Sequence, residues 1–346
     1  QINSVFIKFI IVLNYAVMPA LIGPLIGPLL GGVLVEKASW HWVFLMNLPF
    51  AAIALFLSFW LMPNFTQPSN RLDILGVIVL GGGAFLITLG VELTGTDLPL
   101  WWSVLIIFSS VFLFLGYRWH VYHYPQAIYP LHLWHVRTYR VGLNSNLLTR
   151  LGVASIPLLL PLLFQVVFSY SPLEAAWLLV PMAIAAIIAK PLLPYVLRFF
   201  GYKRVLLWNT LLIGTLLIWL SFFSIQTPKK IIAIHLFFLG MANSIQFTAI
   251  NTLTVADLRS YQKSSANSLM AMNQQLAMGL GTALGAMLVR FNQYIFSGWE
   301  HNLYRAFQST FLLLGAITIV TGWWFRYLHR RDGEQMAKAT GPQAKN

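Results

Sequence analysis

The sequence contains no cysteine, which excludes a disulfide framework, a thiolate metal site and a cysteine nucleophile. Charged residues are also scarce: Asp, Glu, Lys and Arg make up 9% of the 346 residues, against roughly 25% in an average soluble domain. So few charges cannot build a normal water-facing surface, so we expect lipid to cover most of the chain.

The net charge of +13 would suggest nucleic acid binding in a soluble protein. Here the basic residues lie at the ends of apolar runs, which is typical of membrane topology instead. We therefore expect no nucleic acid partner.

Ten apolar runs are long enough to cross a bilayer as helices of about 20 residues. They cover approximately residues 10–35, 42–61, 72–93, 100–119, 141–168, 173–197, 205–225, 231–255, 268–289 and 306–325. Isolated strands cannot satisfy their backbone groups in hydrocarbon. The predicted fold class is therefore an all-α polytopic membrane protein with about ten transmembrane helices.

The distribution of Lys and Arg predicts the orientation of these helices. If the first residue lies inside, the inside loops and tail hold 14 of these cations and the outside loops hold 5. Basic residues favour the cytoplasmic side. We therefore expect both termini in the cytoplasm. As a separate expectation, the membrane is a bacterial inner (plasma) membrane.

A run rich in glycine and proline, ALIGPLIGPLLGGVLV, covers residues 20–35. Its glycines recur every four residues, and small residues on one helix face let a second helix approach closely. Its prolines remove N–H donors and bend the helix. A bent helix with a face of small residues could rock against a neighbouring helix. The alternative is static packing of a kinked helix. The residues predicted to make this contact are Gly23, Pro24, Gly27, Pro28, Gly31 and Gly32.

One short internal repeat supports a design from two similar units. Gly27–Val35 reads GPLLGGVLV and Gly281–Val289 reads GTALGAMLV, with glycine, leucine and valine at matching places. Transporters are commonly built from such repeats.

The run at 20–35 resembles the fifth-span signature of antiporters in the major facilitator superfamily. Three further stretches resemble its fourteen-span drug:proton branch, the EmrB/QacA type. WHWVFLMNLP at 40–49 resembles the start of the sixth span, and RLDILGVIVLGGG at 71–83 resembles the start of an extra central pair. PLLLPLLFQVVFSYSPLEAAWLLVP at 157–181 resembles the junction of spans nine and ten. The resemblance covers nearly the whole chain.

This resemblance implies that the ten runs are spans five to fourteen, and that the four preceding spans are absent. It also implies two helical bundles, divided here into five regions. These are an N-terminal bundle remnant at 1–65, the extra pair at 66–120, a cytoplasmic linker at 121–140, a six-helix bundle at 141–328 and a tail at 329–346.

The stretch PLLPYVLRFFGYKR at 191–204 partly matches the family's gating motif. Gly201, Lys203 and Arg204 fit, whereas Pro194 and Arg198 stand where the family favours glycine and aspartate. A gating role for this loop is therefore not expected to follow the family pattern.

Polar side chains within the last six spans are the candidates for a substrate cavity. Arg150 lies about two to three turns inside its span, where a charge is costly and usually functional. It could instead snorkel to the headgroups. The amides near it and in two other spans could bind a solute or hold helices together. Three polar faces in one unit favour a shared cavity lined by Asn146, Arg150, Gln165, Asn243, Gln246 and Gln274.

Proton coupling needs a titratable side chain in the membrane, yet no carboxylate lies in the middle of a predicted span. Glu92 is the deepest acid, and His235 is a weaker candidate. The simpler account places the coupling acid in the absent spans.

Four histidines crowd one predicted loop, at His120, His123, His132 and His135. They raise the alternative of a membrane enzyme with a metal site. Neutral imidazoles alone rarely complete such a site, and the loop offers no acid. The aromatic residues among them are typical of a membrane-interface belt. We therefore predict no catalytic residue and no metal.

The predicted function is export of drugs or other small lipophilic molecules by proton antiport and alternating access, without a cofactor. The expected partners are membrane lipid, a small-molecule substrate and a periplasmic adaptor protein. The alternatives are a fragment that transports nothing by itself and the membrane enzyme.

Overall fold

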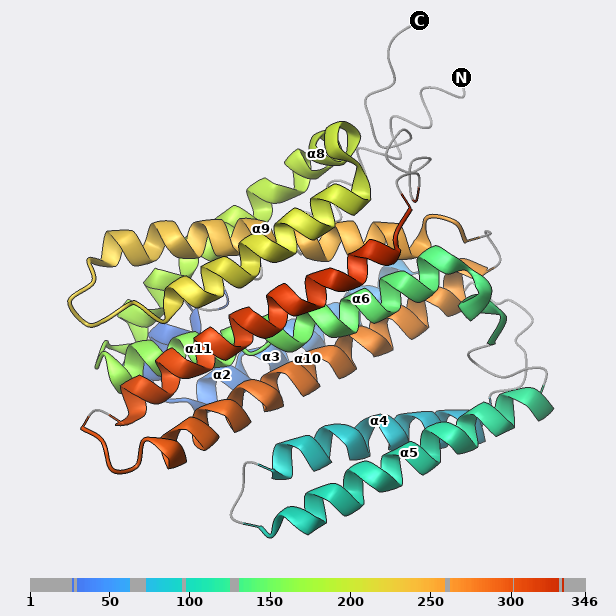
Figure 1. The fold of residues 1–346 in the computed structure, drawn as a ribbon, viewed down its shortest axis with the longest axis horizontal. Coiled ribbons are helices and arrows are strands. Elements are labelled where there is room, and N and C mark those ends of the chain that lie inside the picture. Colours follow the sequence, from blue (N-terminus) through green and yellow to red (C-terminus); the bar gives the residue numbers. More distant parts are fainter. Residues whose placement is uncertain are drawn as a thin grey trace, which may run out of the picture.

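The computed structural model describes residues 27, 30–62, 73–94, 98–124, 131–258, 262–300, 302–329 and 332. Within these residues all the regular elements are helices. The long helices lie side by side with their axes roughly parallel or antiparallel (Figure 1). The helices are α2 (His41–Leu45), α3 (Asn47–Leu61), α4 (Ile74–Leu93), α5 (Leu100–His123), η1 (Leu131–His135), α6 (Arg137–Val153), α7 (Ile156–Leu162), η2 (Leu163–Val167), α8 (Pro172–Leu220), α9 (Lys229–Val255), α10 (Lys263–Ile295), α11 (Asn302–Thr321) and η4 (Gly322–Tyr327). Residues 30–37 are also helical.

Seven of the described helices are long and apolar enough to cross a membrane. They include a continuous span Arg137–Val167, formed by α6, α7 and η2, and a span Asn302–Tyr327, formed by α11 and η4. The predicted run at 268–289 lies in α10, which is 33 residues long but is not one of the seven because it is less apolar. Most of the predicted run at 10–35 lies outside the described residues.

Helix α8 accounts for two predicted spans. Its 49 residues would extend about 74 Å at 1.5 Å per residue, whereas the hydrocarbon core is about 30 Å thick. The chain turns at Gly201, where φ is 73° and ψ is 159°, a conformation that essentially only glycine adopts. In Figure 1 the two halves of α8 run back past each other from this corner. The predicted loop is therefore reduced to about one residue.

The main apolar core is shared by α7, η2, α8, α9 and α11. Leu159, Phe164, Leu217, Leu236 and Phe311 are all at most 1% exposed. Lipid tails are as apolar as these side chains, so water exclusion does little to hold the helices together once they are in the membrane. Close van der Waals packing must therefore contribute more to holding the helices together.

Glycines provide this close packing where helices cross. A Cβ on Gly240 in α9 would lie 2.3 Å from the carbonyl oxygen of Met182 in α8. Gly214 in α8 and Gly315 in α11 face each other, and a Cβ on either would come within 2.9 Å of the other's carbonyl oxygen. Each of these crossings is therefore incompatible with any larger side chain.

The pair α4–α5 forms a separate hairpin that lies to one side of the other helices, against α10 (Figure 1). Gly90 lets the two helices meet, since a Cβ there would lie 2.6 Å from Ile107. One end is closed by a hydrogen bond between the imidazole of His120 and the carboxylate of Asp73, 2.8 Å apart. The sequence analysis found no acid in the histidine-rich loop, and this acid comes from 47 residues away.

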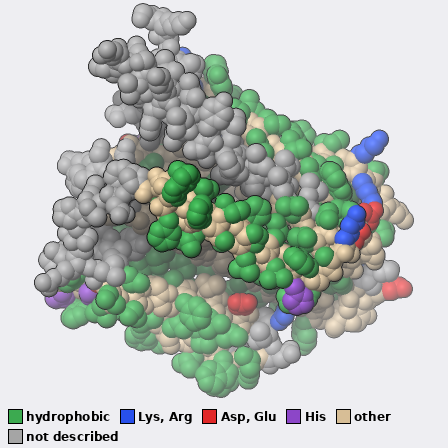
Figure 2. Space-filling view, turned by 180° about the vertical axis from the view of Figure 1, so that it is seen from behind, with side chains coloured by type: hydrophobic (Ala, Val, Ile, Leu, Met, Phe, Trp, Pro, Cys, Tyr) green, Lys and Arg blue, Asp and Glu red, His purple; other side chains and the backbone are tan. Residues whose placement is uncertain are grey.

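The outer surface is apolar, as the scarcity of charge predicts. Figure 2 shows hydrophobic side chains over most of the described surface on one face. Helix α3 is the extreme case, with no buried residue and with Phe59 84% exposed. Water would disfavour such a surface, so lipid or further apolar protein must cover it.

The two copies of the internal repeat differ in what their glycines contact. A Cβ on Gly281 would lie 2.6 Å from the carbonyl oxygen of Arg150 and 2.8 Å from Ala154, and one on Gly285 would lie 2.3 Å from Ser155. In the first copy, a Cβ on the matching Gly27 or Gly31 would meet no described atom within 4 Å. These two matched positions therefore form a close helix crossing only in the second copy, between α10 and the α6–α7 junction.

We predict that Gly281→Ala lowers the free energy of unfolding by about 1–3 kcal/mol, because the new methyl group must displace backbone. Gly31→Ala is the matched control. It should cause no loss, since its methyl group enters open space and alanine favours helix by roughly 0.5–1 kcal/mol. Thermal unfolding of both variants in detergent measures the difference, and equal behaviour would contradict the tight crossing.

Candidate functional site

A small polar cavity lies inside the bundle formed by α6, α8, α9 and α11. Its volume for a water-sized sphere is about 20 Å³, room for one or two water molecules. The lining residues are Asn146, Thr149, Arg150, Val153, Thr210, Ile213, Asn243, Gln246, Phe247, Ile250 and Thr318. Four of the six residues predicted to line a cavity are among them. In this conformation the cavity is closed to any molecule larger than water.

Arg150 provides the charge of this cavity. Its Nε donates a hydrogen bond of 2.9 Å to Oδ1 of Asn146, one turn earlier in α6. Its guanidinium lies 4.6 Å from the centre of the Phe247 ring, within range of a cation–π contact. No ion pair of the described residues includes Arg150. An arginine keeps its charge in proteins. The positive charge of Arg150 is therefore stabilised by the hydrogen bond to Asn146 and the contact with the ring of Phe247.

Asn251 connects the cavity to α10. Its Oδ1 accepts hydrogen bonds from Nδ2 of Asn146 at 3.3 Å and from Nε2 of Gln274 at 3.0 Å. Gln274 therefore joins Arg150 through two intervening amides. The sequence analysis missed Asn251, and the signal that could have found it is its position as an amide eight residues after Asn243 in the same predicted span.

Gln246 and Asn243 lie within one turn of α9 but differ in their partners. Gln246 is 4% exposed; its Oε1 accepts from Asn209 at 2.9 Å and its Nε2 donates to Thr210 at 2.7 Å. Both partners are in α8, so Gln246 joins two helices. Asn243 makes no side-chain hydrogen bond with the described residues and lines the cavity, so its amide can bind a solute.

Gln165 lies apart from this group. It follows Arg150 by about 22 Å along a helix at 1.5 Å per residue, and its side chain is exposed. The grouping of Gln165 with Arg150 assumed that one regular helix carries both residues. However, α6 ends at Val153, and the π-helix η2 (Leu163–Val167) changes the register again.

The two candidates for proton coupling also lie outside the cavity lining. Glu92 is exposed near the end of α4. His235 is 5% exposed, and its Nε2 hydrogen bonds to the carbonyl oxygen of Leu216 at 3.0 Å. The rings of Trp219 and Phe223 pack against it. A carbonyl only accepts, so Nε2 carries a hydrogen, and this histidine has the contacts of a packed core residue.

The glycine and proline run is described only in part, because Gly23, Pro24 and Pro28 lie outside the described residues. A Cβ on Gly32 would lie 2.9 Å from the Cβ of Ala176 in α8. Four residues later, Glu36 accepts a hydrogen bond of 3.1 Å from the backbone N–H of Leu173. The helix at 30–37 therefore touches the first turn of α8.

The histidine-rich stretch holds no metal cluster within the described part of the chain. There, no group of three His, Cys, Asp or Glu side chains could hold an ion. His120 is engaged by Asp73, as described above. His123 hydrogen bonds to the carbonyl oxygen of Trp119 in its own helix at 2.9 Å.

Comparison with known protein families shows to which family this chain belongs. A family model described as the Major Facilitator Superfamily matches residues 143–345, more than half of the chain. The chain belongs to the Major Facilitator Superfamily. It is thus an all-α integral membrane protein of transporter type, and the superfamily indicates a transporter rather than an enzyme.

Several relatives within the superfamily carry names that refer to transport. A protein of Haemophilus influenzae named as transport protein HsrA is 34% identical over 328 residues, which is 94% of this chain and 70% of the relative. Proteins named as multidrug resistance protein MdtD are similar too. That of Enterobacter sp. is 34% identical over 314 residues (90% of this chain, 66% of the relative). That of Serratia proteamaculans is 36% identical over 283 residues (82% and 59%). The chain thus spans 59% to 70% of these relatives.

We predict that Gln246→Leu lowers the free energy of unfolding by about 1 kcal/mol, because two interhelical hydrogen bonds are lost. Asn243→Leu should change it by less than about 0.5 kcal/mol, since no hydrogen bond is broken. Denaturation of both variants in detergent compares them. A larger loss for Asn243→Leu would show that this amide, too, serves mainly to join helices.

Proposed function

We propose that this chain works in the proton-driven export of small lipophilic molecules by alternating access. The observation that carries the proposal is the guanidinium of Arg150, held by Asn146 in a cavity of a major facilitator bundle. A charge in such a place is costly and is retained mainly where it has a function. The names of the relatives, which refer to transport and multidrug resistance, support the same class of cargo.

The chemistry of the cavity suits an amphipathic cargo. Arg150 and Asn243 offer hydrogen-bond donors, while Phe247, Ile213 and Ile250 offer apolar surface. A pocket with a few polar groups on an apolar wall is typical of small-molecule sites. Because the cavity now holds only water-sized molecules, cargo can enter only after the helices move apart. Such a movement is what alternating access requires.

The hydrogen bonds of Asn251 give this movement a structural basis. One oxygen links α6 and α10 through Asn146 and Gln274. Cargo that competes for Asn146 or Arg150 would loosen the link and favour separation of these helices. The contact of Gly32 and Glu36 with the start of α8 is a second place that separation would have to alter.

We propose further that the chain belongs to the fourteen-span drug:proton branch and supplies its spans five to fourteen. Ten of fourteen spans is a share close to the 70% coverage of the Haemophilus relative. No acid lines the cavity among the described residues, which favours a coupling acid elsewhere, in the first four spans of the family pattern. In this proposal both termini face the cytoplasm, the membrane is the bacterial inner membrane, and a periplasmic adaptor protein receives the cargo.

Efflux from inverted vesicles tests the role of Arg150. We expect Arg150→Gln to slow proton-driven uptake of an amphipathic fluorescent dye at least tenfold, since hydrogen bonds to a charged group contribute about 1.5–3 kcal/mol. Arg150→Lys should retain part of the rate, because it keeps the charge but loses the planar fork. Lys190→Gln is the control, since it removes an exposed cation that lies in α8 outside the cavity lining.

A rate unaffected by Arg150→Gln would refute the assignment of the cavity. If the unchanged chain moves no dye under a proton gradient, the alternative of a fragment that does not transport by itself is favoured. If Glu92→Gln or His235→Gln abolishes uptake while Arg150→Gln does not, coupling lies in one of those residues and not outside the chain.

A further inference from the structure

A second cavity lies between the first turns of α6 and η4, the last helical segment that the structure describes. Its volume is about 200 Å³, and its lining residues are Arg137, Arg140, Val141, Asn144, Trp324 and Tyr327. The first four come from α6 and the last two from η4. The proposed transport function makes no use of it. At 200 Å³ it is smaller than the roughly 300 Å³ at which sites for drug-sized ligands begin.

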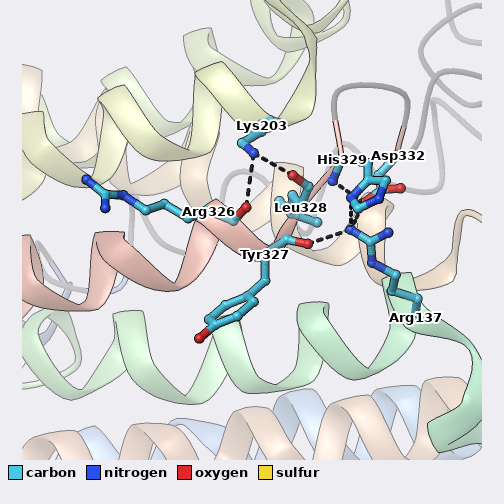
Figure 3. A network of polar contacts seen from close by, with 7 residues as sticks. All are labelled: Arg137, Lys203, Arg326, Tyr327, Leu328, His329 and Asp332. Atoms are coloured by element: carbon cyan, nitrogen blue, oxygen red, sulfur yellow. Dashed lines mark hydrogen bonds and ion pairs between the residues drawn. The ribbon is translucent and has the colours of Figure 1, made fainter.

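The walls of this cavity are fixed by a polar network, shown in Figure 3. Arg137 donates to the carbonyl oxygen of Tyr327, contacts His329, and lies 3.4 Å from the carboxylate of Asp332. Lys203, next to the corner of α8, donates to the carbonyl oxygens of Arg326 at 3.0 Å and Leu328 at 2.6 Å. The end of η4 is therefore held by α6 on one side and by α8 on the other.

The charged groups at this cavity are mostly positive. Helix α6 begins at Arg137, has no acidic residue in its first turn and has no side-chain cap. A helix N-terminus is itself the positive end of the helix dipole, and cations there are unfavourable. Arg137 is opposed by Asp332, but no described ion pair includes Arg140. The cavity therefore has an excess of positive charge.

Two residues that line this cavity, Trp324 and Asn144, have hydrogen-bond donors without a partner among the described residues. The indole N–H of Trp324 is buried and bonds to no described residue, and a buried donor without a partner is destabilising. The amide of Asn144 also makes no hydrogen bond with the described residues. Indole and guanidinium groups only donate. A ligand that fits this lining carries several acceptor oxygens and negative charge, and phosphate has both properties.

We propose that this cavity binds the phosphate headgroup of an anionic phospholipid. Arg140 and the indole of Trp324 donate to the phosphate oxygens, with Arg137 providing further positive charge. The neighbouring Trp323 and Tyr327 are 64% and 62% exposed, at the end of a transmembrane span. Exposed aromatic rings at that position mark the membrane interface, and basic pockets between transmembrane helices bind anionic headgroups there. The position of the cavity beside these interface residues therefore favours a lipid over a soluble phosphate compound.

Lipid titration of the purified full chain, followed by native mass spectrometry, tests this proposal. We expect phosphatidylglycerol to bind more tightly than phosphatidylcholine, and Arg140→Gln to weaken phosphatidylglycerol binding about tenfold. Trp324→Phe, which removes the N–H and keeps the ring, should weaken it about threefold. Arg198→Gln is the matched control, because it removes an exposed cation that does not line the cavity. It should change the affinity less than twofold.

Two outcomes would overturn the proposal. Equal weakening by Arg140→Gln and Arg198→Gln would mean that diffuse charge attracts the lipid. Binding of inorganic phosphate as tight as that of phosphatidylglycerol would make the cavity a site for free phosphate. Dye uptake is a separate readout, so loss of the transport proposal would leave this result intact.

Discussion

The close approach of helix backbones is the constraint on which the rest of this structure depends. In lipid, apolar side chains gain little by leaving one apolar surface for another, so contact must come from shape and from hydrogen bonds. Glycines at the crossings of α8 with α9, of α8 with α11 and of α10 with α6 supply the shape. The amides of Asn209, Gln246 and Asn251 supply the hydrogen bonds.

This constraint also positions the charged group of the cavity. Gly281 in α10 lies close against the carbonyl oxygen of Arg150 itself. About two turns earlier in the same helix, Gln274 donates to Asn251 of α9, which also accepts a hydrogen bond from Asn146 of α6. Backbone contact and amide link thus fix α10 relative to α6 on either side of the arginine. A helix held at two points sets where the guanidinium can lie. The same helix contacts that hold the bundle together therefore also determine the position of the charged group in the cavity.

Much of the helix pattern could be predicted from the sequence, because apolar runs of about 20 residues have few alternatives in a membrane. The corner at Gly201 lies within the predicted loop between two spans. Its tightness depends on the backbone conformation of Gly201, and the presence of a glycine does not by itself indicate that this conformation is adopted. The grouping of Asn146, Arg150, Asn243 and Gln246 followed from polar residues in apolar spans. Gln165 was grouped with them because one regular helix was assumed, although Pro157 and Pro161 remove N–H donors between it and Arg150. The pairing of Asp73 with His120 and the role of Asn251 were missed for a related reason. Both depend on which helices become neighbours, and periodicity along one helix carries no information on that.

The corner at Gly201 has a mechanical consequence. Since the two halves of α8 meet at one glycine with no loop between them, a tilt of one half must shift the adjoining end of the other. A second place where the bundle can bend lies in another helix. The span from Arg137 to Val167 is suited to it, because its hydrogen-bond ladder is interrupted after Val153 and widened at Leu163. The half of that span that holds Arg150 can thus bend relative to the other half while α8 keeps its shape.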